Sequence, residues 1–306
     1  MVARLQKIVV ALLAISCLVW ATSFVRSGHP VWAAVGAALI ALAYAGVLGV
    51  EFIVLAHVQR SASTVPQPTA RQLFTAWWGE ALAAPRVFCW RQPFRSNAEP
   101  DNIPASTSNQ RGVLLVHGFV CNRGLWNPWM RRLREQRIPF IAVNLEPIFG
   151  SMDNYTSTIE AAVRRLEECT GLAPVIVGHS MGGLAIRAWL RDSDNHGRAH
   201  RLVTIGTPHH GTWLARFAMT QNGRQMRLNS AWLNGIAESG TQAPFHQFTC
   251  FYGNCDNIVF PALTATLPGA DNRHIAGTAH VHMAFHESVF SEVQNWLRSP
   301  SCRRLT

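Results

Sequence analysis

A stretch near the middle of the chain, Val175 to Leu190, limits the possible folds most strongly. It begins with apolar, β-branched residues, continues through Gly178-His-Ser-Met-Gly182 and ends in a run with helical character. A buried strand that passes through a sharp turn into a helix is a unit of a parallel α/β sheet. We therefore expect an α/β fold with Ser180 in the turn.

The glycines on either side of Ser180 give this turn a chemical meaning. Gly178 and Gly182 remove side chains where strand and helix approach each other, so that the hydroxyl of Ser180 can project above the sheet. Met181 then begins the helix, and its backbone N–H points to where negative charge would develop on a reacting carbonyl. The pattern predicts a nucleophilic serine; the alternative is a plain turn.

A second apolar stretch, Gly112 to Phe119, predicts another buried strand that ends in a His-Gly turn. The turn would bring the backbone N–H of Phe119 beside that of Met181 and complete an oxyanion hole. Each such donor is worth roughly 100- to 1,000-fold in rate. We interpret His117 as a structural residue of the turn, because it precedes the nucleophile in the chain.

Two aspartates could orient a catalytic base. Asp256 follows the short predicted strand Phe248 to Tyr252, and functional loops of α/β sheets lie at the carboxyl ends of strands. Asp271 is the second candidate, but Pro268-Gly-Ala-Asp-Asn272 is more typical of an ordinary turn before a strand. We expect Asp256 to be the catalytic acid.

Three histidines follow the next predicted strand and compete for the role of the base. His280 comes first, in the loop after the strand, and is the preferred candidate. His282 is its main rival. His286 belongs to the amphipathic run Phe285 to Leu297, so we expect it near a helix start.

These segments together resemble the bacterial true lipases of the α/β-hydrolase superfamily, over roughly residues 110 to 298. The matching segments are Val116-His-Gly-Phe119, Gly178-His-Ser-Met-Gly182, Thr204-Ile-Gly-Thr-Pro-His-His-Gly-Thr212, and Asp256-Asn-Ile-Val259 followed by His280. The resemblance implies an α/β-hydrolase fold and cleavage of carboxylic esters through an acyl-enzyme. For His209 and His210 we expect a structural role near the active-site rim.

One departure from that pattern concerns metal binding. Many secreted lipases of this kind carry an acidic residue two positions after the catalytic histidine, where it helps to bind calcium, and here that residue is His282. Calcium prefers hard oxygen ligands, for which imidazole is a poor substitute. The chain has neither H-E-x-x-H nor C-x-x-C. We therefore expect no metal and no cofactor.

Strands that alternate with helices complete the prediction of a mostly parallel sheet with helices on both faces, in a catalytic domain at 110–306. Pro139 to Leu145 is a further predicted strand. Residues 213–241 interrupt this alternation. They could form a packed crossover or a cap or lid over the acyl site.

The first 60 residues predict a two-span transmembrane hairpin. Ile8 to Val25 and Val31 to Val50 are apolar runs, each long enough to cross about 30 Å of hydrocarbon as a helix. A cleaved signal peptide would explain the first run but not the second. Lys and Arg are more numerous beside the outer ends than in the turn, which holds only Arg26. We therefore expect the inner membrane, with the catalytic domain on the cytoplasmic side.

Residues 61–109 are expected to link the hairpin to the catalytic domain. Ser61 to Ala70 is a Pro/Ser/Thr linker, and the apolar residues from Leu73 to Leu82 predict a helix. This helix could lie in the headgroup zone, where Trp is favoured, or pack on the domain. Ser96 to Gln110 is a polar loop.

Charge and cysteine content refine the expected partners. The formal net charge is +10, and a basic membrane protein most simply faces anionic lipid headgroups. Nucleic acid is not an expected partner, since no basic motif with interleaved aromatics is present. Seven cysteines without a tight framework favour a reducing compartment. Cys250 and Cys255 could pair if the domain were outside.

The resulting hypothesis is a membrane-anchored serine hydrolase of the lipase or esterase type. Ser180 attacks, His280 accepts its proton, Asp256 orients the imidazole, and the N–H groups of Phe119 and Met181 bind the oxyanion. The substrate would be an ester or acyl lipid. An acyltransferase that uses the same acyl-enzyme is the alternative, and a catalytically inactive membrane scaffold is a third.

Overall fold

Six parallel strands form the centre of the C-terminal part of the chain. The computed structural model describes residues 1–61, 65–103, 110–239 and 245–299. The strands are β1 (Val113–Val116), β2 (Phe140–Ala142), β3 (Val175–His179), β4 (Arg201–Ile205), β5 (Phe248–Tyr252) and β6 (Asp271–His274). Their order in the sheet is β2-β1-β3-β4-β5-β6, and every neighbouring pair is parallel. Parts of the predicted linker (62–64), polar loop (104–109) and cap segment (240–241) lie outside the described residues.

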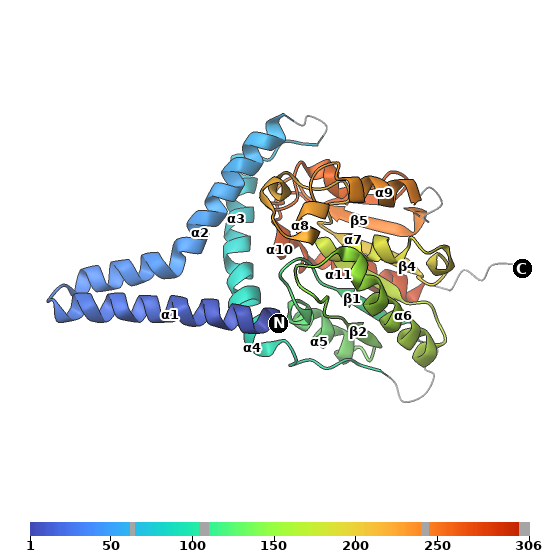
Figure 1. Cartoon of the computed structure of the whole chain (residues 1–306), viewed down its shortest axis with the longest axis horizontal. Coiled ribbons are helices and arrows are strands. Elements are labelled where there is room, and N and C mark those ends of the chain that lie inside the picture. Colours follow the sequence, from blue (N-terminus) through green and yellow to red (C-terminus); the bar gives the residue numbers. More distant parts are fainter. Residues whose placement is uncertain (62–64, 104–109, 240–244, 300–306) are drawn as a thin grey trace, which may run out of the picture.

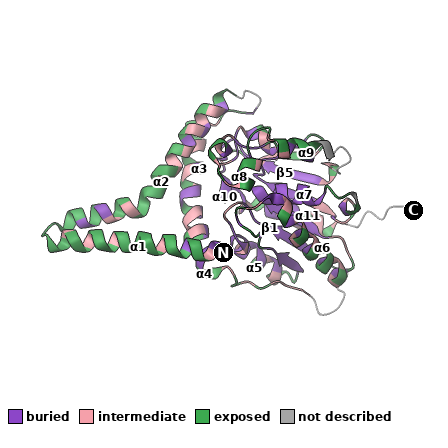
Figure 2. Ribbon diagram, in the orientation of Figure 1, coloured by how far each residue is buried: buried purple, intermediate pink, exposed green. Residues whose placement is uncertain are grey.

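Alternate residues of the central strands face opposite sides of the sheet, as the period of two requires. Leu114 and Ile176 face one apolar cluster, and Leu115 and Val177 face the other. The first cluster includes residues of α6 (Thr156–Thr170) and α7 (Met181–Trp189); the second includes residues of α5 (Asn127–Glu135) and α11 (Glu287–Arg298). Figure 2 shows the buried strands between these helices. The predicted parallel sheet with helices on both faces is confirmed.

Shorter elements connect these layers. They are η1 (Arg86–Arg91), α4 (Gln92–Arg95), η2 (Arg123–Trp126), η3 (Met152–Tyr155), η4 (Ser193–Asn195), η5 (Trp213–Phe217), α8 (Gln221–Gln225), α9 (Ala231–Ser239), η6 (Phe245–Gln247), η7 (Ala262–Ala265) and α10 (His280–Met283). In the segment that could form a cap, Ala215, Met226 and Leu233 are buried in the cluster around α6 and α7. These residues pack as a crossover would.

The N-terminal hairpin consists of α1 (Val2–Arg26) and α2 (Pro30–Arg60), joined by a turn at Gly28. Both helices are long and apolar enough to cross a membrane. None of the residues in the most apolar 18-residue window of α1 is buried, and 11% of those in the window of α2 are buried, whereas a core helix of a soluble domain is mostly buried. Figure 1 shows the turn far from the α/β domain, whereas the opposite ends of both helices lie beside that domain.

Helix α3 (Ala70–Pro85) connects the hairpin to the domain and contacts both. Its Ala76 and Glu80 are buried, whereas Phe74 and Trp78 are exposed. It thus packs on the domain with one face, as one of the two alternatives predicts, and presents aromatic side chains on another; its position in the headgroup zone stays a prediction. The Nε1–H of Trp77 donates to the carbonyl of Ala45 in α2 at 2.9 Å.

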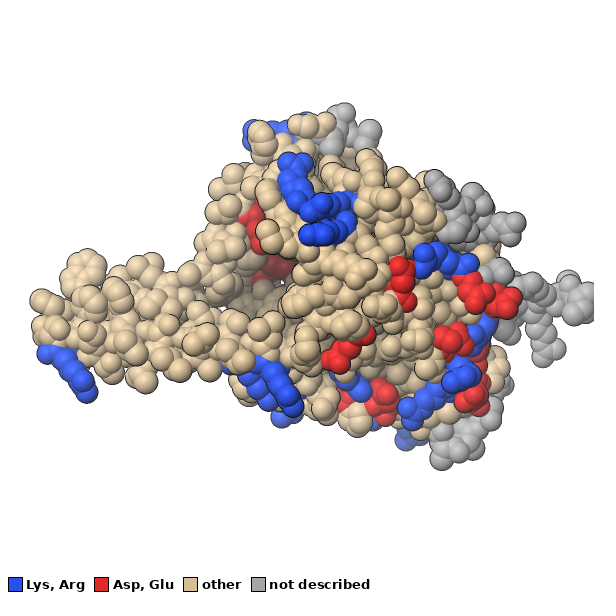
Figure 3. Space-filling view, viewed as in Figure 1, with Lys and Arg blue, Asp and Glu red and all other residues tan. Residues whose placement is uncertain are grey.

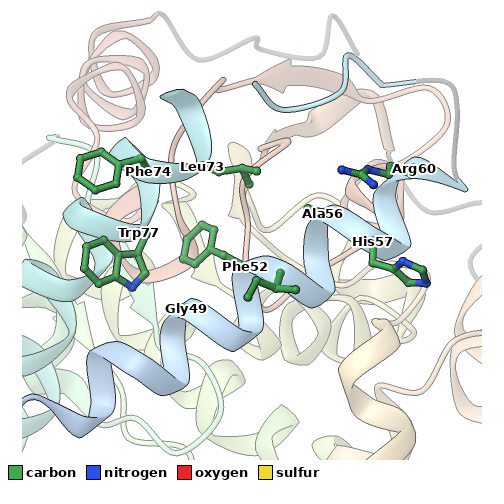
Figure 4. Close-up of a pocket in the computed structure, with 9 residues that line it drawn as sticks. Gly49, Phe52, Ala56, His57, Arg60, Leu73, Phe74 and Trp77 are labelled. Carbon is green, nitrogen blue, oxygen red and sulfur yellow. The ribbon is translucent and has the colours of Figure 1, made fainter. Parts of the chain in front are cut away.

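A groove of about 480 Å³ lies between α2 and α3 (Figure 4). Its lining is mostly apolar, with Phe52 and Leu73 among the lining residues, while His57 and Arg60 mark the C-terminal end of α2. Hairpin and α3 therefore form one helical unit on the side of the domain.

Candidate active site

Ser180 occupies a strained turn between β3 and α7. Its φ is +55°, a region that non-glycine residues rarely adopt and that costs on the order of 1–3 kcal/mol. A Cβ at Gly178 would lie 2.7 Å from the backbone nitrogen of Gly183, and one at Gly182 would lie 2.5 Å from the carbonyl oxygen of Val116. The two glycines thus permit the close approach of strand and helix that the spacing predicts.

Hydrogen bonds hold this turn in place. The N–H of Ser180 donates to the carbonyl of Ile205 in β4 at 2.8 Å, and the hydroxyl of Thr207 donates to the carbonyl of Ser180 at 2.9 Å. The neighbouring strand β4 and the segment after it therefore fix the backbone that carries the serine.

Asp256 and His280 form a buried pair at the same edge of the sheet. The Nδ1 of His280 lies 2.9 Å from Oδ2 of Asp256. The other oxygen, Oδ1, accepts the N–H groups of Ile258 at 3.0 Å and Val259 at 2.8 Å, which fixes the orientation of the carboxylate. Burial alone would lower the pKa of His280, but attraction to Asp256 and the hydrogen bond with it outweigh burial and raise that pKa.

The rival candidates lie in other surroundings. Asp271 is the first residue of β6 and forms an ion pair with Arg273 at 2.7 Å. His286 is half-buried and precedes α11, where its Nδ1 accepts the N–H of Ser288, so its predicted place near a helix start is confirmed. His282 is half-buried beside Gly79 of α3. Of the three histidines, His280 alone is hydrogen-bonded to Asp256.

Ser180 and His280 line one cavity of about 540 Å³. No hydrogen bond joins their side chains in the described part of the chain, and such contacts often tighten only when substrate binds. Phe119 lines the same cavity, and its neighbour Gly118 is so close to Ser180 that a Cβ there would lie 2.8 Å from that of the serine. Met181 is the first residue of α7, where backbone N–H groups lack an acceptor within the helix. The structure therefore places all five predicted site residues at one location.

Two other histidines have structural surroundings. The buried ring of His117 accepts the N–H of Leu145 at Nε2 (3.0 Å), and burial lowers its pKa to about 4. His209 is buried, with Nε2 at 3.0 Å from the hydroxyl of Thr204. Cys250 and Cys255 are both buried free thiols.

The described residues include no group of three or more His, Cys, Asp and Glu side chains arranged to hold a metal.

His179 is a contact of the candidate base that the sequence did not single out. Its ring lies 4.6 Å from that of His280, centroid to centroid, and its Nε2 is 3.1 Å from the carbonyl oxygen of His280. Burial, with the neighbouring His280, lowers the pKa of His179 to about 3, so the ring is neutral and Nε2–H can donate to that carbonyl. Its place inside the glycine–serine motif was the only available signal.

Two carboxylates of the N-terminal helices also support the loop that carries His280. Glu80 of α3 is buried and accepts the N–H groups of Val281 and His282, both at 2.9 Å. Glu51 of α2 accepts the side-chain N–H of Asn257 at 2.7 Å, and Asn257 in turn accepts the N–H of His280 at 3.2 Å. The sequence offered no signal for either contact.

The N-terminal helices also line this cavity. The residues that α1 and α2 contribute to its lining are Leu13, Ala41, Tyr44, Val47, Leu48 and Glu51. The described residues of 213–239 contribute none. Figure 3 shows a hollow between the hairpin and the domain, with acidic side chains at its edge. The N-terminal helices thus form part of the candidate site.

Residues 113–302 match the sequence profile of a family described as the Alpha/beta hydrolase family. This chain belongs to that family. The match begins at β1, so the hairpin and α3 of this α/β hydrolase precede the family region. A search of curated proteins finds no match.

Solved structures show the same fold. The mature form of Bacillus licheniformis lipase BlEst2 is 16% identical, with a TM-score of 0.55 over 64% of this chain and 96% of that one. Aspergillus fumigatus lipase B is 20% identical, with a TM-score of 0.50 over 59% of this chain and 49% of that one. At such identities the likeness establishes the fold of this α/β hydrolase and no more.

Proposed function

We propose that this α/β hydrolase is a membrane-anchored lipase or esterase that cleaves carboxylic esters. The observation that carries the proposal is the buried Asp256–His280 pair, whose histidine lines one mostly apolar cavity together with a serine in a strained strand–helix turn. The similarity in fold to lipases supports the same chemistry.

In the proposed reaction the hydroxyl oxygen of Ser180 forms a bond to the carbonyl carbon of the ester, and its proton passes to Nε2 of His280. The N–H groups of Phe119 and Met181 donate to the oxyanion. The carbon–oxygen bond to the alcohol then breaks, and the alcohol leaves with the proton from His280. Water attacks the acyl-enzyme, gives a proton to His280, and the carboxylic acid is released as Ser180 regains its proton.

Asp256 would keep the imidazole in the tautomer with the proton on Nδ1, so that Nε2 is free to accept. It would also stabilise the imidazolium during each step. No metal or cofactor takes part in this scheme.

The hairpin is proposed as the membrane anchor. Both spans are exposed apolar helices whose outer ends lie at the domain, which is the arrangement that a two-span anchor requires. The excess of Lys and Arg on that side favours the cytoplasmic face of the inner membrane, in contact with anionic headgroups.

The test is Ser180→Ala in the full chain, reconstituted in detergent or vesicles. Hydrolysis of p-nitrophenyl esters and labelling by a fluorophosphonate should both be lost, while the thermal midpoint changes little. Ser157→Ala, an exposed serine of α6, is the matched control and should retain both. Labelling of a folded Ser180→Ala protein would place the nucleophile elsewhere. Acyl transfer to an added alcohol in preference to water would indicate the acyltransferase alternative.

A further inference from the structure

We propose that the active-site cavity opens sideways into the membrane, so that its substrate is an acyl lipid drawn from the leaflet nearest the domain. An ester dissolved in water would then be a poorer substrate. This inference rests on the proposed function, because it assigns the substrate class and the route to Ser180.

The first observation is the composition of the cavity wall. Leu13 of α1, with Ala41, Tyr44 and Val47 of α2, lines the same cavity as Ser180. All four belong to the two helices that are apolar enough to span a membrane. Its volume of about 540 Å³ is within the usual range for ligand pockets.

The second observation is the depth of these residues along the spans. Leu13 is five residues inside the apolar run that begins at Ile8, which corresponds to about 8 Å at 1.5 Å per residue. Val47 and Ala41 are three and nine residues from the domain-side end of the second run at Val50, or about 5 and 14 Å. Half of a hydrocarbon core is about 15 Å. The cavity wall therefore lies at the depth of one leaflet.

The third observation is the arrangement of the helices around the hollow. In Figure 1, α1 and α2 meet at the turn and separate toward the domain, and α3 forms the third side. The space-filling view is hollowed within this triangle (Figure 3). When the spans are embedded, lipid surrounds this opening, and acyl chains can enter it without crossing water.

The fourth observation is that the acidic groups of the cavity are hydrogen-bonded within the protein. The carboxylates of Glu51 and Glu80 are engaged by Asn257 and by the N–H groups of Val281 and His282. Since these acids are satisfied by the protein, the remaining wall offers mainly apolar contacts to an acyl chain. The ester group would meet polar partners only at Ser180 and its neighbours.

Two matched pairs of variants test the lateral opening. Ala41→Trp and Leu13→Trp place a large ring in the wall of the cavity and so narrow the cavity. The controls, Ala43→Trp and Leu12→Trp, place the same ring at exposed positions of the same helices, and these positions do not line the cavity. Each full-length protein is reconstituted in vesicles of phosphatidylethanolamine and phosphatidylglycerol. Two substrates are compared, a pyrene-labelled diacylglycerol within the bilayer and p-nitrophenyl acetate in the water.

We expect the two cavity variants to lower hydrolysis of the bilayer lipid at least tenfold. Hydrolysis of the acetate should fall much less, so that the lipid-to-acetate ratio drops at least fivefold. Ala43→Trp and Leu12→Trp should leave the ratio within twofold of wild type. Thermal midpoints within a few degrees of wild type would show that all four variants fold.

The inference is overturned if the cavity variants lower both substrates equally, or if the control variants change the ratio as much. Failure of the proposed function gives a different result, because wild type would then hydrolyse neither substrate, or Ser180→Ala would hydrolyse both.

Discussion

Glu80 contacts the loop of the candidate base from a helix outside the family region, and replacing it by glutamine is a sharp test of that contact. Its two carboxylate oxygens accept the N–H groups of Val281 and His282, each at 2.9 Å, and the side chain is buried. A glutamine keeps the shape but has one acceptor oxygen. Its NH2 group would therefore face one of the two backbone donors.

The size of the effect follows from this geometry. A buried backbone N–H without an acceptor costs about 1–3 kcal/mol. If the loop relaxes to relieve that cost, His280 loses its alignment, and a barrier higher by that amount slows the reaction by a factor of about 5 to 150. We therefore expect Glu80→Gln to lower kcat/KM within this range and to lower the thermal midpoint.

The pH dependence of kcat/KM tests whether Glu80 acts on His280, because a purely structural role of Glu80 would leave the pKa of His280 unchanged. Asp256, Glu80 and Glu51 all raise the pKa of His280, while His179 beside it is neutral. Since the base must be unprotonated, activity should rise with pH through a pKa above the usual histidine value. Above about pH 7, where Glu80 is ionised, its charge contributes to the raised pKa of His280, so Glu80→Gln should lower that pKa and shift the upper part of the rise to lower pH.

Stability should have the opposite dependence on pH. Burial raises the pKa of Glu80 from 4.5 to about 7, even though the two backbone N–H groups lower it. Between these values the native state holds a proton that the unfolded chain has released, so the free energy of unfolding of wild type falls as pH rises through this window. The fall is on the order of 3 kcal/mol, and Glu80→Gln should lack this contribution.

The assay is p-nitrophenyl ester hydrolysis and thermal unfolding between pH 5 and 9, in one detergent. Glu168→Gln is the matched control, because this residue of α6 is exposed and its ion pair with Arg164 is long, at 4.0 Å. An unchanged kcat/KM together with an unchanged pH profile in Glu80→Gln would refute the reasoning.

Three further outcomes are expected. His280→Ala should lower turnover by several orders of magnitude, whereas His282→Ala and His286→Ala cost far less; a larger loss from His282→Ala would contradict the assignment of the base. Chelators should leave activity and thermal midpoint unchanged, and a midpoint that falls with chelator and recovers with calcium would reveal a calcium site. Membrane association should resist high salt, and a reporter active only outside the cytoplasm should be silent at the C-terminus and active when inserted at Ser27. The reverse pattern would place the domain outside.

The local sequence was sufficient to predict the sheet and the position of its serine. Alternating burial and the glycine spacing are properties of neighbouring residues, so the turn at Ser180 could be predicted from a few positions. Asp256 and His280 are 24 residues apart, but each follows a strand of a parallel sheet. The carboxyl ends of such strands lie at one edge of the sheet, and for this reason the sequence predicts that Asp256 and His280 lie close together.

The contacts made by the N-terminal helices could not be predicted in this way. Glu80 and Val281 are separated by 201 positions, and no periodic pattern connects them. The apolar composition of the two spans indicates a lipid environment, so the sequence predicted a membrane anchor. Composition does not indicate which other parts of the chain a helix contacts. The sequence likewise left open whether residues 213–241 form a packed crossover or a cap over the acyl site, whereas α1 and α2 supply part of the cavity wall and the described residues of 213–239 supply none.

The chain of contacts from Glu51 through Asn257 to the N–H of His280 has a practical consequence for protein engineering. Removing the hairpin to obtain a water-soluble fragment would do more than detach the enzyme from lipid. It would delete one wall of the acyl-binding cavity and leave the amide of Asn257 without its acceptor. A fragment that begins after α3 would also lose the carboxylate that holds Val281 and His282. Such a fragment could retain the sheet and still be a poor catalyst, so activity should be measured with the full chain.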